Sequence, residues 1–237
     1  MSEFTVGFVI FPGITQLDFT GPFEVLSRLG TPPSLSAPSK FAQSRTHVVA
    51  KTMLPVSSDR GLGIVPTCTF QDCPMLDLLC VPGGGTGVVE SLADAETVDF
   101  IRRQGGSATY VTSVCTGAFL LGAAGLLKGR RATTHWAFVD LLPLVGARHE
   151  KGRVVRDGNV FTAGGVTSGI DFAFRIVAEL AGPEVAQAIQ LAIEYDPFPP
   201  FDAGHPDKAS EATMTLMVQR NATARAGLRD ALGALTI

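Results

Sequence analysis

The chain has 237 residues, of which 46% are apolar and 17% charged, and its formal net charge is -3. This length suffices to bury a full core, and no segment has the composition of a linker between domains. We therefore expect one domain over residues 1–237, with a helical tail from about residue 205. No basic cluster is longer than Lys128-Gly129-Arg130-Arg131, so the charge pattern excludes a nucleic-acid partner at this stage.

Targeting signals and metal sites are not predicted. The start Met1-Ser2-Glu3-Phe4 lacks the basic flank of a secretory signal, and no apolar stretch reaches the ~18 residues of a membrane span. We expect a cytoplasmic protein without membrane association. Its four cysteines are then expected as free thiols. Three of them, Cys68, Cys73 and Cys80, lack zinc-site spacing and have no histidine nearby in the sequence, so we expect no metal and no cofactor.

The first half of the chain alternates apolar runs with helical patterns. Residues 6–11 predict a buried strand, followed by a turn at Pro12-Gly13 and a helix that begins near Thr20 or Gly21. The Pro- and Ser-rich residues 31–44 predict an exposed loop. A strand is expected near residues 47–51, a hairpin-like region within 55–69, and a buried strand at 77–82 that ends in Gly83-Gly84-Gly85.

The second half continues the alternation. A helix ends within residues 98–104, a strand follows at 109–114, and residues 116–123 open a helix of small residues. Residues 154–162 read as a hairpin with an Asp157-Gly158 turn, and residues 168–181 as an amphipathic helix. A last helix is expected over residues 210–235. The pattern predicts an α/β fold with a mostly parallel central sheet and helices on both faces.

Cys115 is the main candidate for a catalytic residue. It lies between the β-prone run 109–114 and Thr116-Gly117-Ala118, which begins a helix. A cysteine on such a turn stands above the carboxyl end of the sheet, where the helix start stabilises a thiolate and its N-H groups can receive negative charge. The serine counterpart is the G-x-S-x-G elbow, which is matched in part because Ser113 occupies the first position. A buried structural cysteine is the alternative.

Three other features are expected at the same edge of the sheet. Asp18 follows the first strand, and Gly83-Gly84 follow another, where a backbone without side chains can approach a ligand and supply an oxyanion donor. His135 follows the helix that Cys115 starts and can act as a base or an orienting group. Each has a structural alternative: Asp18 as a helix N-cap, the glycines as a turn, and His135 as a core histidine beside Trp136.

The motifs resemble, as an ordered set, the ThiJ/PfpI (glutamine amidotransferase-like) superfamily. They are Phe11-Pro12-Gly13, Gln16-Leu17-Asp18-Phe19-Thr20-Gly21-Pro22, Val81-Pro82-Gly83-Gly84, Ser113-Val114-Cys115-Thr116-Gly117-Ala118, Ala132-Thr133-Thr134-His135-Trp136 and Thr162-Ala163-Gly164-Gly165-Val166-Thr167-Ser168-Gly169-Ile170-Asp171. The resemblance implies a flavodoxin-like three-layer sandwich, commonly a homodimer, with an elbow cysteine and an acidic partner. The tail 194–204 is similar to that of the isonitrile hydratases in this superfamily.

Within that group the functional residues match Cys115, Asp18 and Thr116 of this chain. The resemblance thus implies hydration of an isonitrile, a small-molecule substrate, to an N-substituted formamide through a Cys115 thioimidate, with Asp18 as general acid and base. Gly83, Gly84 and His135 are expected to contact the substrate or an oxyanion. The segment 31–44 is longer than expected for the family, so the pocket rim is expected to differ.

Two alternatives remain open. The patterns around His135 and Asp171 also resemble the ligand-binding domain of some AraC-type transcription regulators, which bind rather than catalyse. Residues 210–237 are short and weakly basic for paired helix-turn-helix units. The other alternative keeps Cys115 and Asp18 but uses them for glyoxalase-like hydration of a 2-oxoaldehyde or for amide hydrolysis.

Overall fold

The computed structural model describes residues 2–29 and 41–235, and its main sheet has seven strands in the order β10-β11-β7-β6-β1-β2-β5. Neighbouring strands of this sheet are parallel except in the β10–β11 hairpin. The strands are β1 (Ser2–Val9), β2 (Phe41–Ala50), β5 (Cys68–Thr69), β6 (Leu78–Val81), β7 (Tyr110–Val114), β10 (Val154–Asp157) and β11 (Val160–Ala163). Two small sheets pair β3 (Val56–Ser57) with β4 (Gly63–Ile64), and β8 (Arg131–Ala132) with β9 (Arg148–His149).

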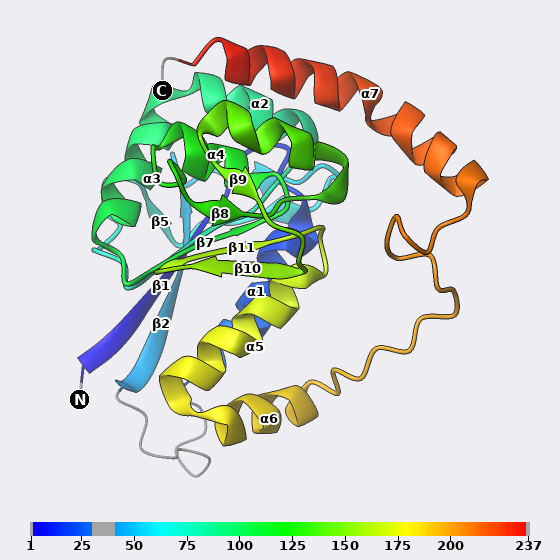
Figure 1. The fold of residues 1–237 in the computed structure, drawn as a ribbon. Helices are drawn as coiled ribbons and strands as arrows, with labels where there is room; N and C mark the ends of the chain where they lie inside the picture. The colour runs from blue at the N-terminus through cyan, green and yellow to red at the C-terminus, as the bar shows by residue number, and fades with distance from the viewer. Residues whose placement is uncertain (1, 30–40, 236–237) are drawn as a thin grey trace.

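Helices cover both faces of the sheet, which confirms the predicted three-layer α/β fold (Figure 1). One face carries α2 (Gly85–Ala93), α3 (Ala95–Ser107), α4 (Gly117–Ala123) and the 3₁₀ helix η2 (Trp136–Val145). The other face carries α1 (Gln16–Leu26) and α5 (Ser168–Ala181), with α6 (Pro183–Ala192) packed on α5. The last helix, α7 (Glu211–Gly233), crosses over α2 and η2.

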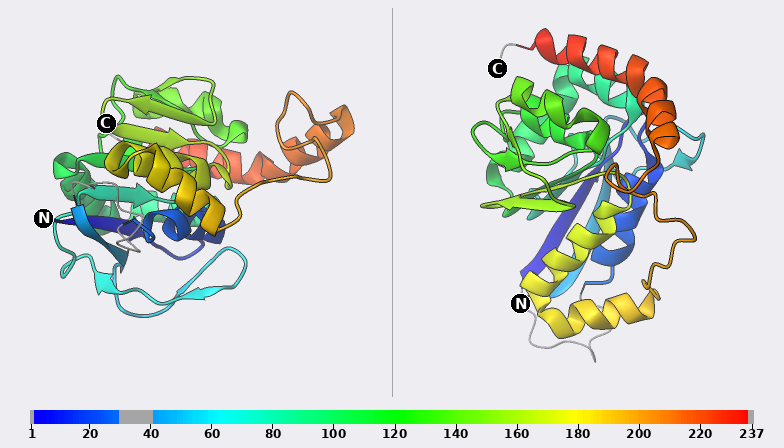
Figure 2. Two further views of the ribbon diagram at one scale, coloured as in Figure 1. Left: turned by 90° about the horizontal axis from the view of Figure 1, so that it is seen from below. Right: turned by 45° about the vertical axis from the view of Figure 1, so that its right-hand side comes forward.

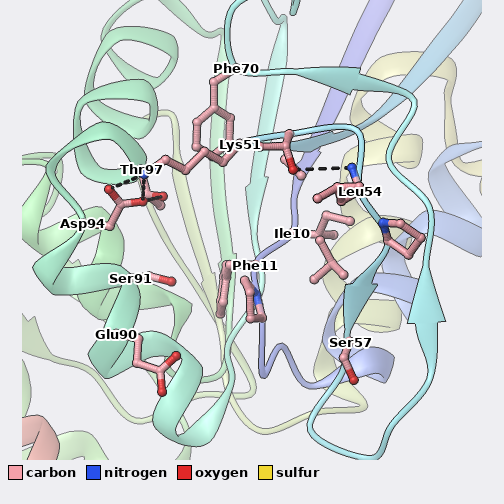
Figure 3. A pocket seen from close by; sticks show the side chains of 15 residues that line it. Ile10, Phe11, Lys51, Leu54, Ser57, Phe70, Glu90, Ser91, Asp94 and Thr97 are labelled. Atoms are coloured by element: carbon pink, nitrogen blue, oxygen red, sulfur yellow. Dashed lines mark hydrogen bonds and ion pairs between the residues drawn. The ribbon is translucent and has the colours of Figure 1, made fainter.

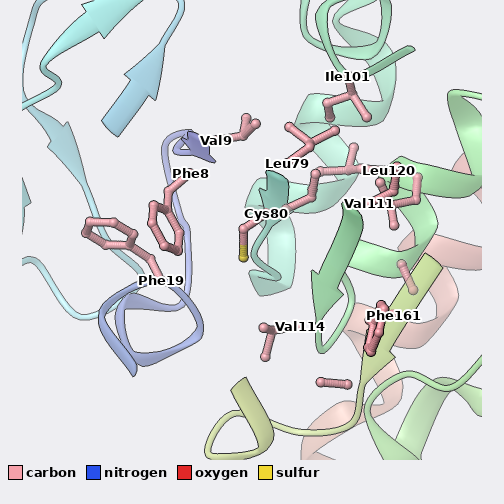
Figure 4. Packing of buried hydrophobic residues seen from close by; sticks show 14 of the residues in the cluster. Phe8, Val9, Phe19, Leu79, Cys80, Ile101, Val111, Val114, Leu120 and Phe161 are labelled. Atoms are coloured by element: carbon pink, nitrogen blue, oxygen red, sulfur yellow. The ribbon is translucent and has the colours of Figure 1, made fainter. Parts of the chain in front are cut away.

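The central strands are apolar because both of their faces are covered. Every residue of β6 and β7 is buried, as expected for parallel strands between two helical layers. Side chains of these strands alternate between the two faces. Phe8 of β1 packs with Phe19 of α1, whereas Leu79 of β6, which pairs with Gly7 next to Phe8, points toward Ile101 of α3 (Figure 4). This core holds the carboxyl ends of β1, β6 and β7 in fixed register.

Several helices and strands begin or end at other residues than the sequence predicted. The first strand ends at Val9 and the first helix begins at Gln16, earlier than expected, which places Asp18 inside α1. Residues 41–44 belong to β2, so the predicted loop 31–44 is wrong at its end, and residues 31–40 lie outside the described chain. The hairpin at Asp157-Gly158 is confirmed, with Gly158 at a φ of +63°, and α5 begins and ends as predicted.

The chain between α6 and α7 runs as an extended arm along the outside of the molecule (Figure 2). Apolar side chains on and beside it are exposed, among them Phe198 at 97% and Phe201 at 79%. The first half of α7 continues this surface with Leu216 and Val218, whereas Leu228 and Leu232 in its second half are buried. In the part of the chain that is described, no helix has the length and apolarity to span a bilayer.

Candidate active site

Three neighbouring strands bring the candidate residues together. β1, β6 and β7 are adjacent and parallel, so their carboxyl ends meet at one edge of the sheet. Asp18 follows β1, Gly83 and Gly84 follow β6, and Cys115 follows β7. A methyl group built on Gly83 would lie 2.8 Å from Asp18 Oδ2 and 2.7 Å from the Thr116 backbone nitrogen. The four segments thus pack into one compact site.

Cys115 occupies a strained turn between β7 and α4. Its φ is 56°, a left-handed conformation that costs a non-glycine residue about 1–3 kcal/mol. The surrounding chain holds it there: the Cys115 N-H donates to the carbonyls of Ala163 and Gly164 at 3.0 and 2.9 Å. Its own carbonyl accepts a hydrogen bond from Thr134 Oγ1 at 2.7 Å. These bonds fix the direction of the thiol, which is 7% exposed.

Asp18 is buried against Cys115. Its carboxyl group is 0% exposed, Oδ2 accepts the Gly83 N-H at 3.0 Å, and the carboxyl interacts with the Cys115 thiol. Oδ1 is buried and has no hydrogen-bond partner among the described residues. Asp18 therefore does not have the alternative role of a helix N-cap, because it lies inside α1. The position before α1 belongs to Thr15, whose side chain caps nothing.

Burial changes the protonation of both groups. Loss of solvent raises the pKa of Asp18 to about 7, although the Gly83 N-H and the Cys115 thiol oppose the shift. Burial also raises the pKa of Cys115 well above its ordinary value, and the charge of Asp18 raises it further. The sequence predicted a depressed thiol pKa from the helix start, and burial outweighs that effect. Near pH 7 the Cys115 thiol therefore keeps its proton, while the Asp18 carboxyl is close to half protonated.

Thr116 supports the sulfur directly. Its backbone N-H and its hydroxyl both hydrogen-bond Cys115 in a way that lowers the thiol pKa, against the larger effect of burial. The Thr116 hydroxyl also accepts the Gly84 N-H at 3.1 Å. In this structure the N-H groups of Gly83 and Gly84 donate to Asp18 and Thr116, and the role of these glycines as oxyanion donors stays a prediction. The two glycines also let the site residues approach the backbone.

His135 stands beside the site without contacting the thiol. Its Nδ1 accepts the Ala137 N-H at 3.2 Å and caps η2, and its ring packs near Trp136 and Phe138. Burial lowers the pKa of His135 to about 4, so the ring is neutral at pH 7. No interaction among the described residues joins it to Cys115. The sequence analysis did not identify the neighbouring Thr134 as a site residue, although its hydroxyl donates a hydrogen bond to the Cys115 carbonyl. The one feature of the sequence that could have indicated this role is the place of Thr134 in the Thr-Thr-His-Trp motif.

A cavity lies away from Cys115, at the carboxyl ends of β1 and β2 (Figure 3). Its volume is about 590 Å³, and none of Asp18, Cys115 or Thr116 lines it. The cavity is lined by the segments that follow β1 and β2, by β3 and by helices α2 and α3. Lys51 Nζ forms an ion pair with Asp94 Oδ1 at 3.0 Å in its wall. The buried carboxyl and thiol meet at Cys115 and not in this cavity.

The comparisons with known proteins agree with this geometry. Residues 5–179 match the DJ-1/PfpI family model. The chain is 54% identical to the isonitrile hydratase of Pseudomonas putida over 209 residues, covering 88% of this chain and 86% of that protein. It is 26% identical to the HTH-type transcriptional regulator GbdR of Pseudomonas aeruginosa, over 81% of this chain and 51% of that one.

A ThiJ/PfpI family protein from Pseudomonas syringae has a similar solved structure, with a TM-score of 0.91 and 40% identity. The match covers 98% of this chain and 92% of that one. Together with the site at the end of β7 and the order of the motifs, these matches confirm the resemblance drawn from the sequence. The chain belongs to the DJ-1/PfpI family.

Proposed function

We propose that the protein hydrates an isonitrile to an N-substituted formamide, with Cys115 as nucleophile and Asp18 as general acid and base. The observation that carries this proposal is the buried contact between a carboxyl of pKa about 7 and a thiol. The identity of 54% to an isonitrile hydratase supports the choice of substrate class. An isonitrile carbon has a lone pair, so it needs a proton and a soft nucleophile at the same atom.

The first step forms a thioimidate. The proton of the Cys115 thiol shifts to the Asp18 carboxylate, which leaves a thiolate that Thr116 stabilises through its N-H and hydroxyl. The isonitrile carbon then takes the proton from Asp18 while the sulfur bonds to the same carbon. The product is R-N=CH-S-Cys115, and Asp18 is again a carboxylate. A carboxyl with a pKa near 7 suits both roles, since it is close to the operating pH.

The second step releases the formamide. Asp18 takes a proton from a water molecule as the water oxygen bonds to the thioimidate carbon, and passes that proton to the nitrogen. The C-S bond of the tetrahedral intermediate then breaks, the oxygen becomes the formyl carbonyl, and the hydroxyl proton returns to the sulfur. The sum is one isonitrile and one water converted to one formamide, with Cys115 regenerated as a thiol.

The direct test compares two cysteine variants on a simple alkyl or aryl isonitrile. Cys115→Ala should abolish formamide formation, whereas Cys73→Ser removes a thiol outside the site and should retain full turnover. Substantial residual activity in Cys115→Ala would exclude covalent catalysis by this residue. Methylglyoxal and a peptide amide in parallel assays separate isonitrile hydration from the glyoxalase-like and hydrolytic alternatives. Turnover of any of them argues against the alternative of a domain that binds a ligand without catalysis, which the partial match to the transcriptional regulator GbdR leaves open.

We also propose that the protein forms a homodimer and is located in the cytoplasm. The exposed Phe198 and Phe201 on the arm, with Leu216 on α7, form an apolar surface that a second copy can cover. Phe201→Asp should therefore shift the species seen by light scattering from dimer to monomer, and Leu54→Asp, at another exposed apolar residue, should not. A monomeric wild-type protein would remove the dimer from this proposal.

A further inference from the structure

Two cysteines outside the site lie close together at the edge of the sheet. Cys68 begins the edge strand β5, and a turn brings Cys73 back toward it, with the Cys73 N-H donating to the Thr69 carbonyl at 3.0 Å. The Cys73 thiol donates to the Pro74 carbonyl at 3.4 Å, and the Cys68 and Cys73 side chains are close enough for each to shift the pKa of the other. Both cysteines are half-buried free thiols, whereas the next cysteine along the chain, Cys80, is 0% exposed. The pair is thus reachable from solvent and Cys80 is not.

A histidine lies beside this pair, although the sequence places none near it. His47 is on β2, which pairs with β5, and its Nδ1 is 3.8 Å from Cys68 Sγ. Its Nε2 is buried and has no partner among the described residues. Burial, helped by the charge of Arg45, lowers the pKa of His47, so the ring is neutral at pH 7 and Nδ1 can accept a proton.

The two thiols are not equivalent. The proximity of Cys73 lowers the pKa of Cys68, against a larger increase from burial. Burial and the Cys68 thiol together raise the pKa of Cys73 to about 12. Cys68 therefore loses its proton more readily and has the neighbouring base, which makes it the attacking thiol. Cys73 is placed to react second, with the sulfur of Cys68.

We infer that Cys68 and Cys73 form a redox-active dithiol that a small-molecule disulfide of the glutathione type converts to an intramolecular disulfide, with His47 as base. His47 takes the Cys68 proton, and the thiolate attacks the disulfide to give a mixed disulfide and one thiolate leaving group. Cys73 then loses its proton and attacks Cys68 Sγ, which releases the second thiolate. Two protein thiols are oxidised, one small-molecule disulfide is reduced to two thiols, and the two thiol protons end on those products.

The pairing of Cys68 and Cys73 is not explained by a metal site among the described residues. Within residues 2–29 and 41–235, no three His, Cys, Asp or Glu side chains are arranged to hold a metal ion. The turn between the cysteines also carries Phe70, which stacks on Phe100 with ring centroids 4.4 Å apart and lines the cavity of Figure 3. The dithiol therefore adjoins a wall of that cavity rather than the Cys115 site.

Peptide mass spectrometry tests the inference directly. The full-length protein is incubated with oxidised glutathione, blocked with an alkylating reagent and cleaved on the amino side of aspartate. Because Asp59, Asp72, Asp77 and Asp94 flank the three cysteines, this cleavage puts Cys68, Cys73 and Cys80 in the separate peptides 59–71, 72–76 and 77–93. We expect 59–71 linked to 72–76, an alkylated 77–93, and loss of the link after dithiothreitol.

Variants distinguish this order of events from random oxidation. Cys73→Ser should stop at a glutathione adduct on Cys68, and Cys68→Ser should leave Cys73 largely unmodified. His47→Gln should slow the reaction of Cys68 by about a hundredfold, the usual effect of a positioned base, while His149→Gln at an exposed histidine should not. Peptides 59–71 and 72–76 that stay unlinked in wild-type protein, or glutathione adducts that accumulate on both cysteines, would overturn the inference.

Discussion

The carboxyl group of Asp18, in helix α1, is buried against the thiol of Cys115 at the end of β7, the third strand of the central sheet counted from β10. Desolvation keeps the Asp18 carboxyl protonated to about pH 7. The proposed reaction moves a proton between the Asp18 carboxyl and the Cys115 thiol and restores it at the end of the cycle. The contact therefore generates the main predictions about catalysis and pH.

Asp18→Asn should lower kcat for isonitrile hydration by about a hundredfold or more, because the amide keeps the shape of the carboxyl but cannot donate and recover a proton. Asp59→Asn is the matched control. Asp59 is an exposed carboxylate whose charge raises the pKa of Asp18, and its loss should change kcat little. Steady-state kinetics with one isonitrile checks both. Near-normal turnover in Asp18→Asn would reduce Asp18 to a structural residue.

Stability should fall as the pH rises toward neutrality because of Asp18. Its pKa is about 7 in the folded protein against an ordinary value of 3.8, so the folded state binds more protons between these values. The stabilisation from this group is complete below pH 4 and is lost as the pH rises through 7, by a few kcal/mol at about 1.4 kcal/mol per pH unit. Urea unfolding should therefore show Asp18→Asn gaining stability relative to wild type from pH 4 to pH 8. A constant difference between the two proteins would contradict the raised pKa.

Much of this site was predictable from the sequence. Asp18 and Cys115 each follow an apolar run, and parallel strands between helices collect such positions at one edge of the sheet. The sequence could not show that burial would raise the pKa of both groups, because desolvation depends on packing around the whole site. Nor could it show where the first helix starts. The residues 16–18 of α1 carry no capping side chain that marks its beginning.

Gly84→Ala should disrupt the site, whereas Gly85→Ala should be tolerated. A methyl group on Gly84 would lie 2.4 Å from the Gly13 carbonyl oxygen, which is backbone and cannot move aside, while one on Gly85 meets nothing within 4 Å. Overpacking of this kind costs about 3 kcal/mol, or about 10 °C in Tm for a chain of this size. Thermal melts of the two variants check it. Equal Tm values would mean that the Gly84 contact is looser than described.

The glycines also show a limit of reasoning from the sequence alone. Gly83 and Gly84 were expected to offer N-H groups to a ligand, but those groups are used by Asp18 and Thr116. A glycine that lets two protein segments approach and a glycine that binds substrate look the same in a sequence, because both lack a side chain. The cap that His135 forms on η2 could not be predicted for a similar reason, because it depends on a backbone that only folding places; its contact with substrate stays a prediction.

Thr134→Val should weaken the turn that holds Cys115. The Thr134 hydroxyl donates to the buried Cys115 carbonyl at 2.7 Å, and losing that bond costs about 1–3 kcal/mol. We expect a lower Tm and a lower kcat, because the thiol loses part of its orientation. Thr133→Val is the control, since Thr133 is also buried but its hydroxyl makes no hydrogen bond to the described residues. Equal kcat values for the two variants would show that Thr134 does not position Cys115.

The most direct test of the central claim is a rapid-quench experiment that follows the mass of the Cys115 peptide and the formamide together. Wild-type protein is mixed with excess isonitrile, quenched in acid at short times and digested. We predict an adduct on Cys115 with the mass of one isonitrile, formed before formamide and decaying at the rate of formamide release. Formamide that appears while Cys115 stays unmodified at every time point would contradict nucleophilic catalysis by Cys115.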